Sequence, residues 1–371
     1  MEIFPNKKVR LHIELTGSCN LQCVYCFQSN WNTPKRIKNE LSTAQIMDLI
    51  DQSKKIGCKT VTITGGEPFL RKDIYEIINY CQEFDVEILT NSTLLDKEKI
   101  KEIGEKFPQL KRIKISIDGL GGHDINRWPS NYKKIIENFN YFKRYTKCVL
   151  IANTVITQYT IDELMDLYKI LKKIPINIWR IDLPFFAGRY INNASKFEVE
   201  PIKAVAVLKK ILKKYFSDKK PFGIEIFNLY KSSMVTDHLF KFDVDSHPCS
   251  YSQWRTLCIK PNGDLIFCPS LLVKMANIVS RNGKINVGKA IKHARKNKFF
   301  KIKVKSIKKC VECRYLNICG SGCRADALYW EDKILAPDPV ACTYIELMEK
   351  HIIPILPKQE AEYLNKLIIK K

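Results

Sequence analysis

The sequence lacks the features of a membrane or secreted protein. No stretch approaches the ~20 uninterrupted apolar residues of a membrane-spanning helix. No apolar block near the amino terminus resembles a secretory signal, and there is no internal repeat or low-complexity tract outside the cysteine clusters. We therefore expect a soluble, cytoplasmic protein with no membrane partner.

Acidic residues are scarce. The chain of 371 residues has 39 Asp and Glu against 62 Lys and Arg, a net charge of +23. Basic surfaces favour nucleic acid, acidic peptides or anionic lipids. The lysines are scattered rather than gathered in one block, and such a composition can equally reflect codon usage or growth temperature. An acidic peptide or protein is the most economical functional partner. Nucleic acid is not expected, because no segment resembles an RNA-binding domain.

What the chain does have is a regular alternation of strand-like and helix-like segments. After a first strand before Cys19, strands are expected at 59–64, 86–90, 112–117, 149–156 and 176–183, and helices at 43–55, 73–84, 97–107, 132–144 and 162–172. This order predicts an α/β fold with a parallel sheet and right-handed crossovers. Ligands of such folds bind at the carboxyl ends of the strands.

Cysteine is abundant, with 14 residues, and in a cytoplasmic chain this favours metal ligation over disulfides. Cys19, Cys23 and Cys26 form the pattern CxxxCxxC. A [4Fe–4S] cluster normally takes four thiolates, so three leave one iron open to a small molecule. The alternative, a zinc knuckle, needs a fourth Cys or His close by, and the nearest is His12, upstream in the first expected strand.

The CxxxCxxC spacing, with the aromatic Tyr25 before the last cysteine, resembles the radical S-adenosylmethionine (radical SAM) enzymes. The resemblance implies a TIM-like partial (βα)6 barrel whose open iron is chelated by the methionine moiety of S-adenosylmethionine. It also implies reductive cleavage to a 5′-deoxyadenosyl radical that abstracts hydrogen from the substrate. A low-potential donor such as ferredoxin or flavodoxin would supply the electron.

The same resemblance implies a set of cofactor-binding residues. Gly65, Gly66, Glu67 and Pro68 follow the second strand, where two glycines permit close backbone approach, and correspond to the motif that holds the methionine amino group. The remaining contacts implied are Tyr25, Phe27, Asn91, Ser116, Asp118, Arg127 and Asn153. Simpler roles stay open for the polar ones: a turn for Asp118, loop hydrogen bonds for the asparagines and a surface salt bridge for Arg127. No catalytic acid or base is assigned.

A second cysteine array occupies the carboxyl-terminal part. Its members are Cys249, Cys258, Cys268, Cys310, Cys313, Cys319, Cys323 and Cys342. The pattern resembles the SPASM domain, and eight thiolates are what two fully ligated [4Fe–4S] clusters require. The resemblance implies interlaced ligand sets, 249, 258, 268 and 323 for the first cluster and 310, 313, 319 and 342 for the second. Zinc ribbons are the alternative. Cys58, Cys81 and Cys148 fall outside every motif and are expected to pack in the core.

Three regions are predicted: a radical SAM barrel over 1–190, a bridging region over 191–247 with a helix at 201–216, and a small α+β SPASM domain over 248–371. The last would contain a hairpin, 256–259 with 265–267, and a helix over 340–353. The expected cofactors are therefore S-adenosylmethionine and three [4Fe–4S] clusters, one that binds it and two auxiliary.

The function implied by the resemblance is an oxidation in which hydrogen is abstracted from a peptide or protein substrate and the auxiliary clusters take up the electron. Pro269 stands where sulfatase-maturing members carry an acid, which disfavours that reaction. A second alternative is oxidative decarboxylation of a tetrapyrrole or small cofactor. An alternative of another class is a non-catalytic, multi-cluster electron carrier.

Overall fold

A computed structural model describes residues 9–27, 39–227, 229–237, 242–249, 251 and 253–369. Some parts of the predicted regions lie outside the described residues: 1–8, 28–38, 228, 238–241, 250, 252 and 370–371.

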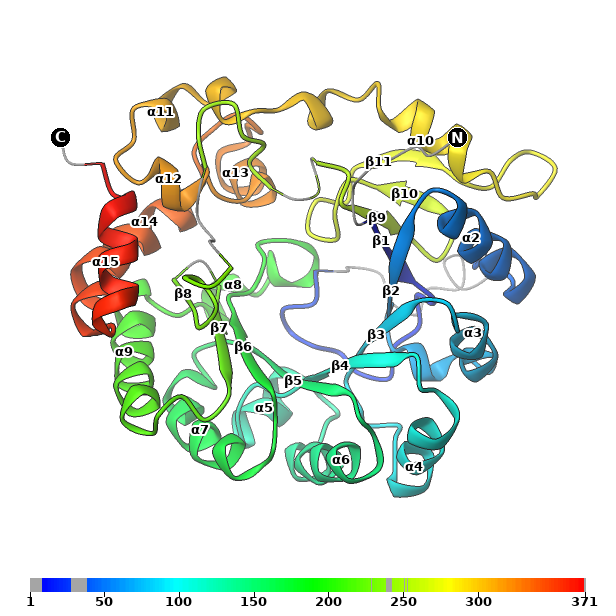
Figure 1. Cartoon of the computed structure of the whole chain (residues 1–371), viewed down its shortest axis with the longest axis horizontal. Coiled ribbons are helices and arrows are strands. Elements are labelled where there is room, and N and C mark those ends of the chain that lie inside the picture. Colours follow the sequence, from blue (N-terminus) through cyan, green and yellow to red (C-terminus); the bar gives the residue numbers. More distant parts are fainter. Residues whose placement is uncertain are drawn as a thin grey trace.

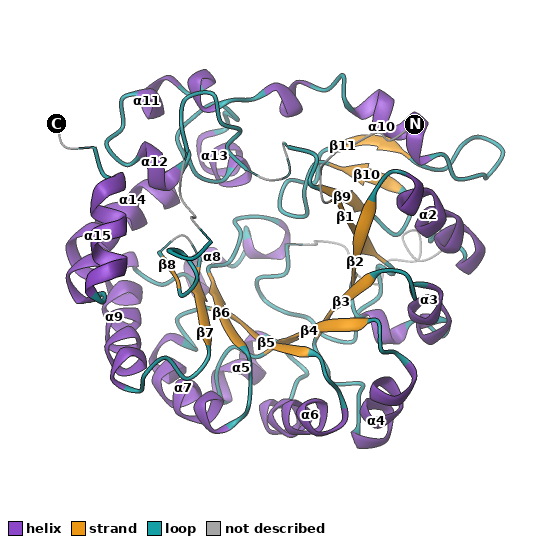
Figure 2. Ribbon diagram, in the orientation of Figure 1, coloured by secondary structure: helices purple, strands orange, loops and turns teal. Residues whose placement is uncertain are grey.

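A single sheet of 11 strands forms the frame, in the order β11-β10-β9-β1-β2-β3-β4-β5-β6-β7-β8 (Figure 2). Its strands are β1 Val9–Glu14, β2 Cys58–Thr64, β3 Asp85–Thr90, β4 Leu110–Ser116, β5 Val149–Val155, β6 Ile178–Asp182, β7 Gly223–Ile226, β8 Tyr230–Lys231, β9 Thr256–Ile259, β10 Asp264–Ile266 and β11 Lys274–Asn277. Strands β1 to β7 are parallel to one another, which confirms the expected α/β partial barrel and adds a seventh parallel strand.

Helices cover the outer side of the curved sheet (Figure 1). They are α2 Thr43–Lys55, α3 Ile74–Tyr80, α4 Lys97–Lys106, α6 Tyr132–Tyr145, α7 Leu164–Lys173 and α9 Pro201–Ser217. Each buries one stripe against the sheet: α6, for example, buries Ile135, Phe139 and Phe142, three or four residues apart. Two short helices, α5 Gly121–Asn126 and α8 Ala194–Phe197, lie in loops after strands.

The carboxyl-terminal part continues the same sheet. Strand β9 pairs in parallel with β1, on the edge opposite β2, and β9, β10 and β11 then run antiparallel. The expected hairpin is present, and Gly263 has the positive φ of 80° that its turn needs. The remaining helices are α10 Val287–Ala294, α11 Lys308–Val311, α12 Leu316–Cys319, α13 Arg324–Glu331, α14 Pro339–Leu347 and α15 Lys358–Leu367.

Two faces of the parallel strands differ in chemistry, because successive side chains point to opposite sides. Leu11, Ile13, Ile63 and their equivalents belong to the core beneath the helices. The alternate positions face the barrel interior and include charged pairs: Glu87 lies 3.1 Å from both Arg10 and Lys114. The interior is thus polar and able to hold a polar ligand.

Several expected element bounds were wrong. The helix expected over 73–84 ends at Tyr80, because residues 81–84 form a turn in which Phe84 N–H donates to the Cys81 carbonyl. The helix expected over 340–353 is α14 followed by a π-helical turn, Met348–Ile352. Within the described residues, no helix is long and apolar enough to cross a membrane.

Candidate active site

The first cysteine loop follows β1 at the carboxyl ends of the parallel strands. Its backbone is tied to the segment after α5: Gln22 N–H donates to the Trp128 carbonyl (2.7 Å) and Val24 N–H to the Asn126 carbonyl (2.9 Å). The Leu21 N–H lies 3.4 Å from Cys19 Sγ, the kind of backbone contact that favours a thiolate. The loop is therefore fixed by the neighbouring strand ends as well as by its own sequence.

All 14 cysteines are free thiols. Burial raises the pKa of Cys19 to about 11 and that of Cys23 to about 12, and nearby thiols raise both further while Arg127 opposes the rise. Ligation must therefore displace protons from these buried groups. Cys58, Cys81 and Cys148 are buried, as expected for packing residues.

The described residues contain no group of three or more His, Cys, Asp or Glu side chains arranged to hold one metal ion. A zinc site gathers its ligands around a single atom, whereas the thiolates of an iron–sulfur cube each bind a separate iron. His12, the nearest candidate for a fourth zinc ligand, lies on β1 and not in the cysteine loop. Its side chain is partly buried, and desolvation and the nearby charge of Lys114 lower its pKa to about 4.

Gly65 and Gly66 allow the turn after β2 to lie against the cysteine loop. Gly66 N–H donates to the Thr16 carbonyl (2.8 Å) and Glu67 N–H to the Ser18 carbonyl (2.8 Å). A Cβ on Gly66 would overlap the Ser18 carbonyl and meet the Cys19 Cβ at 3.0 Å. The close approach that the two glycines provide is therefore made to the cysteine loop itself.

The Glu67 carboxylate is buried and bonded within the protein. It accepts hydrogen bonds from Thr90 Oγ1 and from Asn91 N–H, both at 2.8 Å, and from Phe69 N–H at 3.3 Å. Burial raises its pKa to about 7, although these bonds oppose the rise. Pro68 is buried and begins the next turn, Pro68–Leu70. Glu67 thus joins the ends of β2 and β3.

Asp118, Arg127 and Tyr25 form one buried cluster. The Arg127 guanidinium donates to both carboxylate oxygens of Asp118, at 2.9 and 3.0 Å, and lies 5.2 Å from the centre of the Tyr25 ring. The Tyr25 hydroxyl and Val155 N–H also donate to Asp118. Burial acts to raise the pKa of Asp118, but the charge and hydrogen bonds of Arg127, together with His123 and the Tyr25 hydroxyl, hold that pKa below its usual value. The surface salt bridge considered for Arg127 is wrong, because Arg127 is only 7% exposed.

The other implied contacts divide into two kinds. Asn91 is used by the loops: its amide donates to Asn20 Oδ1 (3.0 Å) and its carbonyl oxygen accepts from Thr93 N–H (2.9 Å). Ser116 and Asn153 are register partners at the ends of β4 and β5, and neither side chain makes a hydrogen bond in the described part of the chain. Those two side chains are available to a ligand. Phe27 packs edge-on against Phe185, 6.4 Å between ring centres.

The second cysteine array forms two groups of electrostatic neighbours. In one, Cys268 interacts with Cys249, Cys258 and Cys323. In the other, Cys319 interacts with Cys310, Cys313 and Cys342. The two groups have the same members as the ligand sets implied by the resemblance. Leu271 N–H also donates to Cys268 Sγ at 3.1 Å, a further contact that suits a thiolate.

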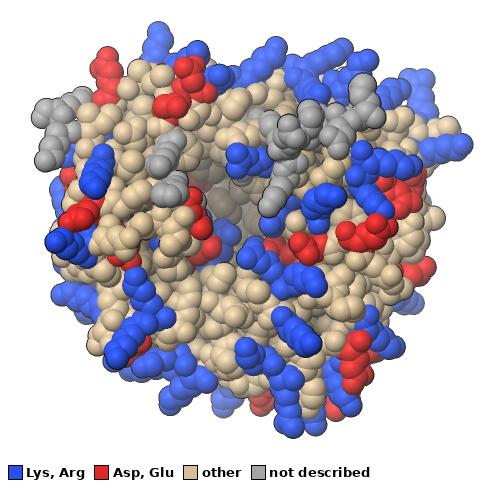
Figure 3. Space-filling view, in the orientation of Figure 1, with Lys and Arg blue, Asp and Glu red and all other residues tan. Residues whose placement is uncertain are grey.

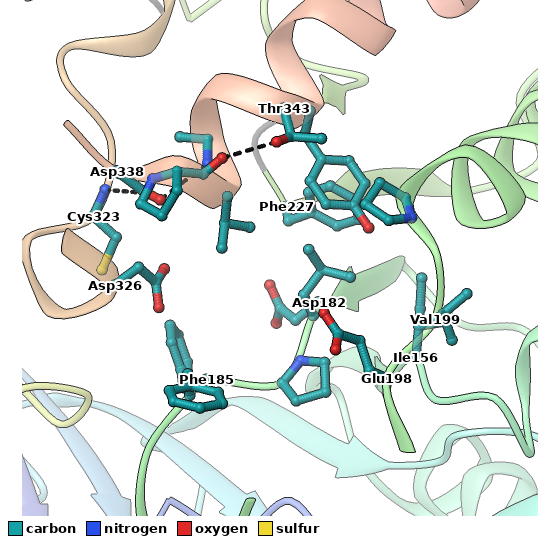
Figure 4. Close-up of a pocket in the computed structure, with 18 of the residues that line it drawn as sticks. Ile156, Asp182, Phe185, Glu198, Val199, Phe227, Cys323, Asp326, Asp338 and Thr343 are labelled. Atoms are coloured by element: carbon teal, nitrogen blue, oxygen red, sulfur yellow. Dashed lines mark hydrogen bonds between the residues drawn. The ribbon is translucent and has the colours of Figure 1, made fainter. Parts of the chain in front are cut away.

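A cavity of about 480 Å³, called here the central cavity, lies between β6–β7 and α13–α14 (Figure 4). Cys323 and Asp326 form part of its wall, and burial together with the neighbouring Asp338 raises the pKa of Asp326 to about 7. On another wall, Phe186 stacks on Trp330 with 4.2 Å between ring centres. A hollow is visible near the centre of the face drawn in Figure 3.

The central cavity is in contact with the first cysteine loop through the segment 183–190, which sequence reasoning missed. Tyr190 and Phe186 pack with Tyr25 and Cys23, and Arg189 N–H donates to the Cys26 carbonyl at 2.9 Å. A signal was present, since Pro184, Phe185 and Phe186 follow directly on a parallel strand, where ligand-binding loops occur. The segment 183–190 thus contacts the first cysteine loop and also lines the cavity that Cys323 of the second array adjoins.

Comparison with known proteins agrees with this geometry. The family model of the Radical SAM superfamily matches residues 13–171. GTP 3',8-cyclase of Clostridium perfringens (strain SM101) is 30% identical over 217 residues, which are 57% of this chain and 64% of that protein, so the chain spans less than two thirds of that relative. AdoMet-dependent heme synthase of Nitratidesulfovibrio vulgaris (strain Hildenborough) is 26% identical over 351 residues, 89% of this chain and 91% of that protein.

Solved structures extend the likeness in fold over almost the whole chain. Streptococcus suis SuiB bound to precursor peptide SuiA has a TM-score of 0.66 at 16% identity, covering 91% of this chain and 76% of that one. A structure of anSMEcpe with bound AdoMet has a TM-score of 0.73 at 18% identity, covering 96% and 98%. Residues 13–171 are therefore similar to the Radical SAM superfamily. Over almost the whole chain, including the carboxyl-terminal part, the fold is similar to those of SuiB and anSMEcpe.

Proposed function

We propose that this enzyme oxidises a peptide or protein substrate held in the central cavity. The observation that carries the proposal is the position of that cavity: Cys323 of one auxiliary group lines it, and Phe186 and Tyr190 join it to Cys23 of the first loop. A substrate there would lie between a site of hydrogen abstraction and an electron acceptor.

The residues fit a cluster that binds S-adenosylmethionine. Cys19, Cys23 and Cys26 would hold it, and when bound, the cluster and S-adenosylmethionine supply the 5′-deoxyadenosyl radical. Asp118 and Arg127 hold Tyr25 and, with it, the cysteine loop. Ser116 and Asn153 offer unbonded polar groups at the strand ends, as the implied cofactor contacts require.

Two auxiliary clusters are part of the proposal, held by the two four-cysteine groups. Cys323 of the first group lines the cavity and Cys268 of the same group is buried, whereas Cys310, Cys313, Cys319 and Cys342 are not among the described residues that line it. The first cluster would take up the substrate electron. A ferredoxin or flavodoxin would deliver the electron that starts the reaction. The proposal also includes the division into the regions 1–190, 191–247 and 248–371 and a cytoplasmic location.

A peptide substrate is supported by the structural neighbours, because SuiB was solved with a precursor peptide and anSMEcpe with the Cp18Cys peptide. The scattered positive charge, spread over the face in Figure 3, would attract an acidic segment of such a substrate to the exterior. Oxidative decarboxylation of a tetrapyrrole is the second candidate, favoured by the long match to a heme synthase.

The experiment is anaerobic reconstitution followed by addition of S-adenosylmethionine and dithionite. We expect 5′-deoxyadenosine, and about 12 irons per chain if all three clusters form. The Cys23→Ala variant should lose the product, whereas the control Cys148→Ala, a packing residue outside both arrays, should retain it. A fully loaded protein that makes no 5′-deoxyadenosine would instead be an electron carrier.

A further inference from the structure

The central cavity is acidic although the protein is strongly basic. Five carboxylate side chains line it against two basic ones, in a chain whose net charge is +23. The acids are Asp182, Glu198, Glu225, Asp326 and Asp338, and the bases are Arg180 and Lys231. The local sign is therefore opposite to that of the outer surface.

Two of these carboxylates, Asp182 and Asp338, are bonded to other groups of the protein. Arg180 donates to both oxygens of Asp182, at 2.6 and 3.1 Å. Asp338 accepts hydrogen bonds from Cys323 N–H (2.7 Å) and Ala341 N–H (3.0 Å), which fixes the start of α14. These two acids are structural, and they leave the others to face the cavity.

Glu198 and Glu225 make no ion pair or side-chain hydrogen bond with any described residue. Glu225 stands opposite Lys231 in the β7–β8 pair, without a salt bridge between them, and its charge also reaches Arg180. Figure 4 shows the Glu198 carboxylate close to that of Asp182, with Asp326 on the other side of the cavity. An occupant therefore meets more negative than positive charge.

The rest of the lining is aromatic. Phe185, Phe186, Tyr190, Phe227, Trp330 and Tyr344 form much of the wall. Aromatic faces attract cations and cover hydrocarbon. A group with an apolar stem and a cationic head satisfies both parts of this lining, whereas a carboxylate such as a porphyrin propionate would be repelled.

We infer that the central cavity binds a basic side chain, lysine or arginine, of the peptide substrate, and that Glu198 and Glu225 select it. The inference rests on the proposed function and names the class of residue presented to the enzyme. An acidic segment, where present, would contact the outer surface and not this cavity.

The test measures binding of three pentapeptides, acetyl-Gly-Gly-Xaa-Gly-Gly-amide with Xaa as lysine, norleucine or glutamate, to the reconstituted full-length protein by calorimetry. We expect the lysine peptide to bind roughly tenfold more tightly than the norleucine peptide, and the glutamate peptide most weakly. Glu225→Gln and Glu198→Gln should each reduce the preference for lysine several-fold. The control Glu105→Gln changes a glutamate that is 63% exposed on α4 and should leave the preference unchanged.

Equal binding of the lysine and norleucine peptides, tighter binding of the glutamate peptide, or a preference that survives both cavity variants would overturn the inference. The production of 5′-deoxyadenosine is measured on the same samples. Protein that cleaves S-adenosylmethionine without discriminating among the peptides loses only this inference. Protein that prefers lysine but makes no 5′-deoxyadenosine keeps the cavity assignment and loses the proposed function.

Discussion

At the residue scale, the site depends on buried charges that are satisfied by partners within the protein. Asp118 and Arg127 are the clearest case, since both are almost completely buried. Removing one member of such a pair leaves the other charge uncompensated in a medium of low polarity, which costs more than the pair itself contributes.

Asp118→Asn should therefore lower the free energy of unfolding by about 3–5 kcal/mol, measured by urea denaturation. The folded-state pKa of Asp118 is depressed, so its contribution to stability is present above its unfolded pKa near 3.8 and is lost as pH falls below that value. Asp166→Asn, which breaks an exposed pair with Lys169, should change stability by less than about 1 kcal/mol. Equal effects of the two variants would contradict the structural role of Asp118.

The pKa of Glu67 is shifted in the opposite direction to that of Asp118. Its pKa is raised from 4.5 to about 7 in the folded state, so the folded protein binds more protons than the unfolded chain between these values. The unfolding free energy of the cluster-free protein should fall as pH rises from 4.5 to 7, by on the order of 3 kcal/mol from this residue. Comparison with Glu67→Gln isolates the effect, because the variant should lack that part of the slope. Parallel pH profiles for the two proteins would refute it.

At the element scale, the turn after β2 and the cysteine loop act as one unit. Gly66→Ala should displace the loop, since the added methyl group overlaps the Ser18 carbonyl. We expect the reconstituted variant to lose about one cluster's share of iron, roughly four atoms per chain, by iron analysis.

Gly121→Ala is the matched control for that substitution. Its new Cβ would meet only Glu163 Oε1, at 3.7 Å, and alanine is the better helix former in α5. Full iron content is expected. Normal loading of Gly66→Ala would show that the loop tolerates a wider separation from β2.

Element order was predictable because strand and helix periodicities differ, and α2 was expected with its observed bounds. Helix α5 was not, since Gly121 and Gly122 are poor helix formers. It is held by a distant residue, Glu163, whose carboxylate accepts from Leu120 N–H and Gly122 N–H. Local pattern cannot show such a contact.

The site was predictable to the extent that motif spacing identifies ligand types. The cysteine groups follow from spacing and resemblance, but Glu67 and Asp118 turn out to be bonded within the protein. Whether a carboxylate faces a ligand or a neighbouring loop depends on loop packing, which spacing does not determine. The acidic lining of the central cavity was hidden for the same reason, because its residues come from β6, β7 and α13, from the position after α8 and from the position before α14.

At the scale of the whole molecule, the sheet passes through the predicted region boundaries without a break. Strand β1 has β2 on one side and β9 on the other. A fragment ending at residue 247 would leave the β1 edge unpaired, and an exposed edge of this kind promotes aggregation. We expect fragment 1–247 to elute as aggregates in size-exclusion chromatography, while the full chain does not. A monodisperse fragment that unfolds cooperatively would show that the barrel is independent of β9.

The pairing of His12 with Cys258 along β1 and β9 has a consequence for how such chains can be recombined. Strand β9 carries Cys258 of the second array, and its partner β1 is followed by the loop that contains Cys19. A chimera that joins this barrel to the final third of a relative must keep the β1–β9 register residue by residue, or the two cysteine arrays shift relative to each other.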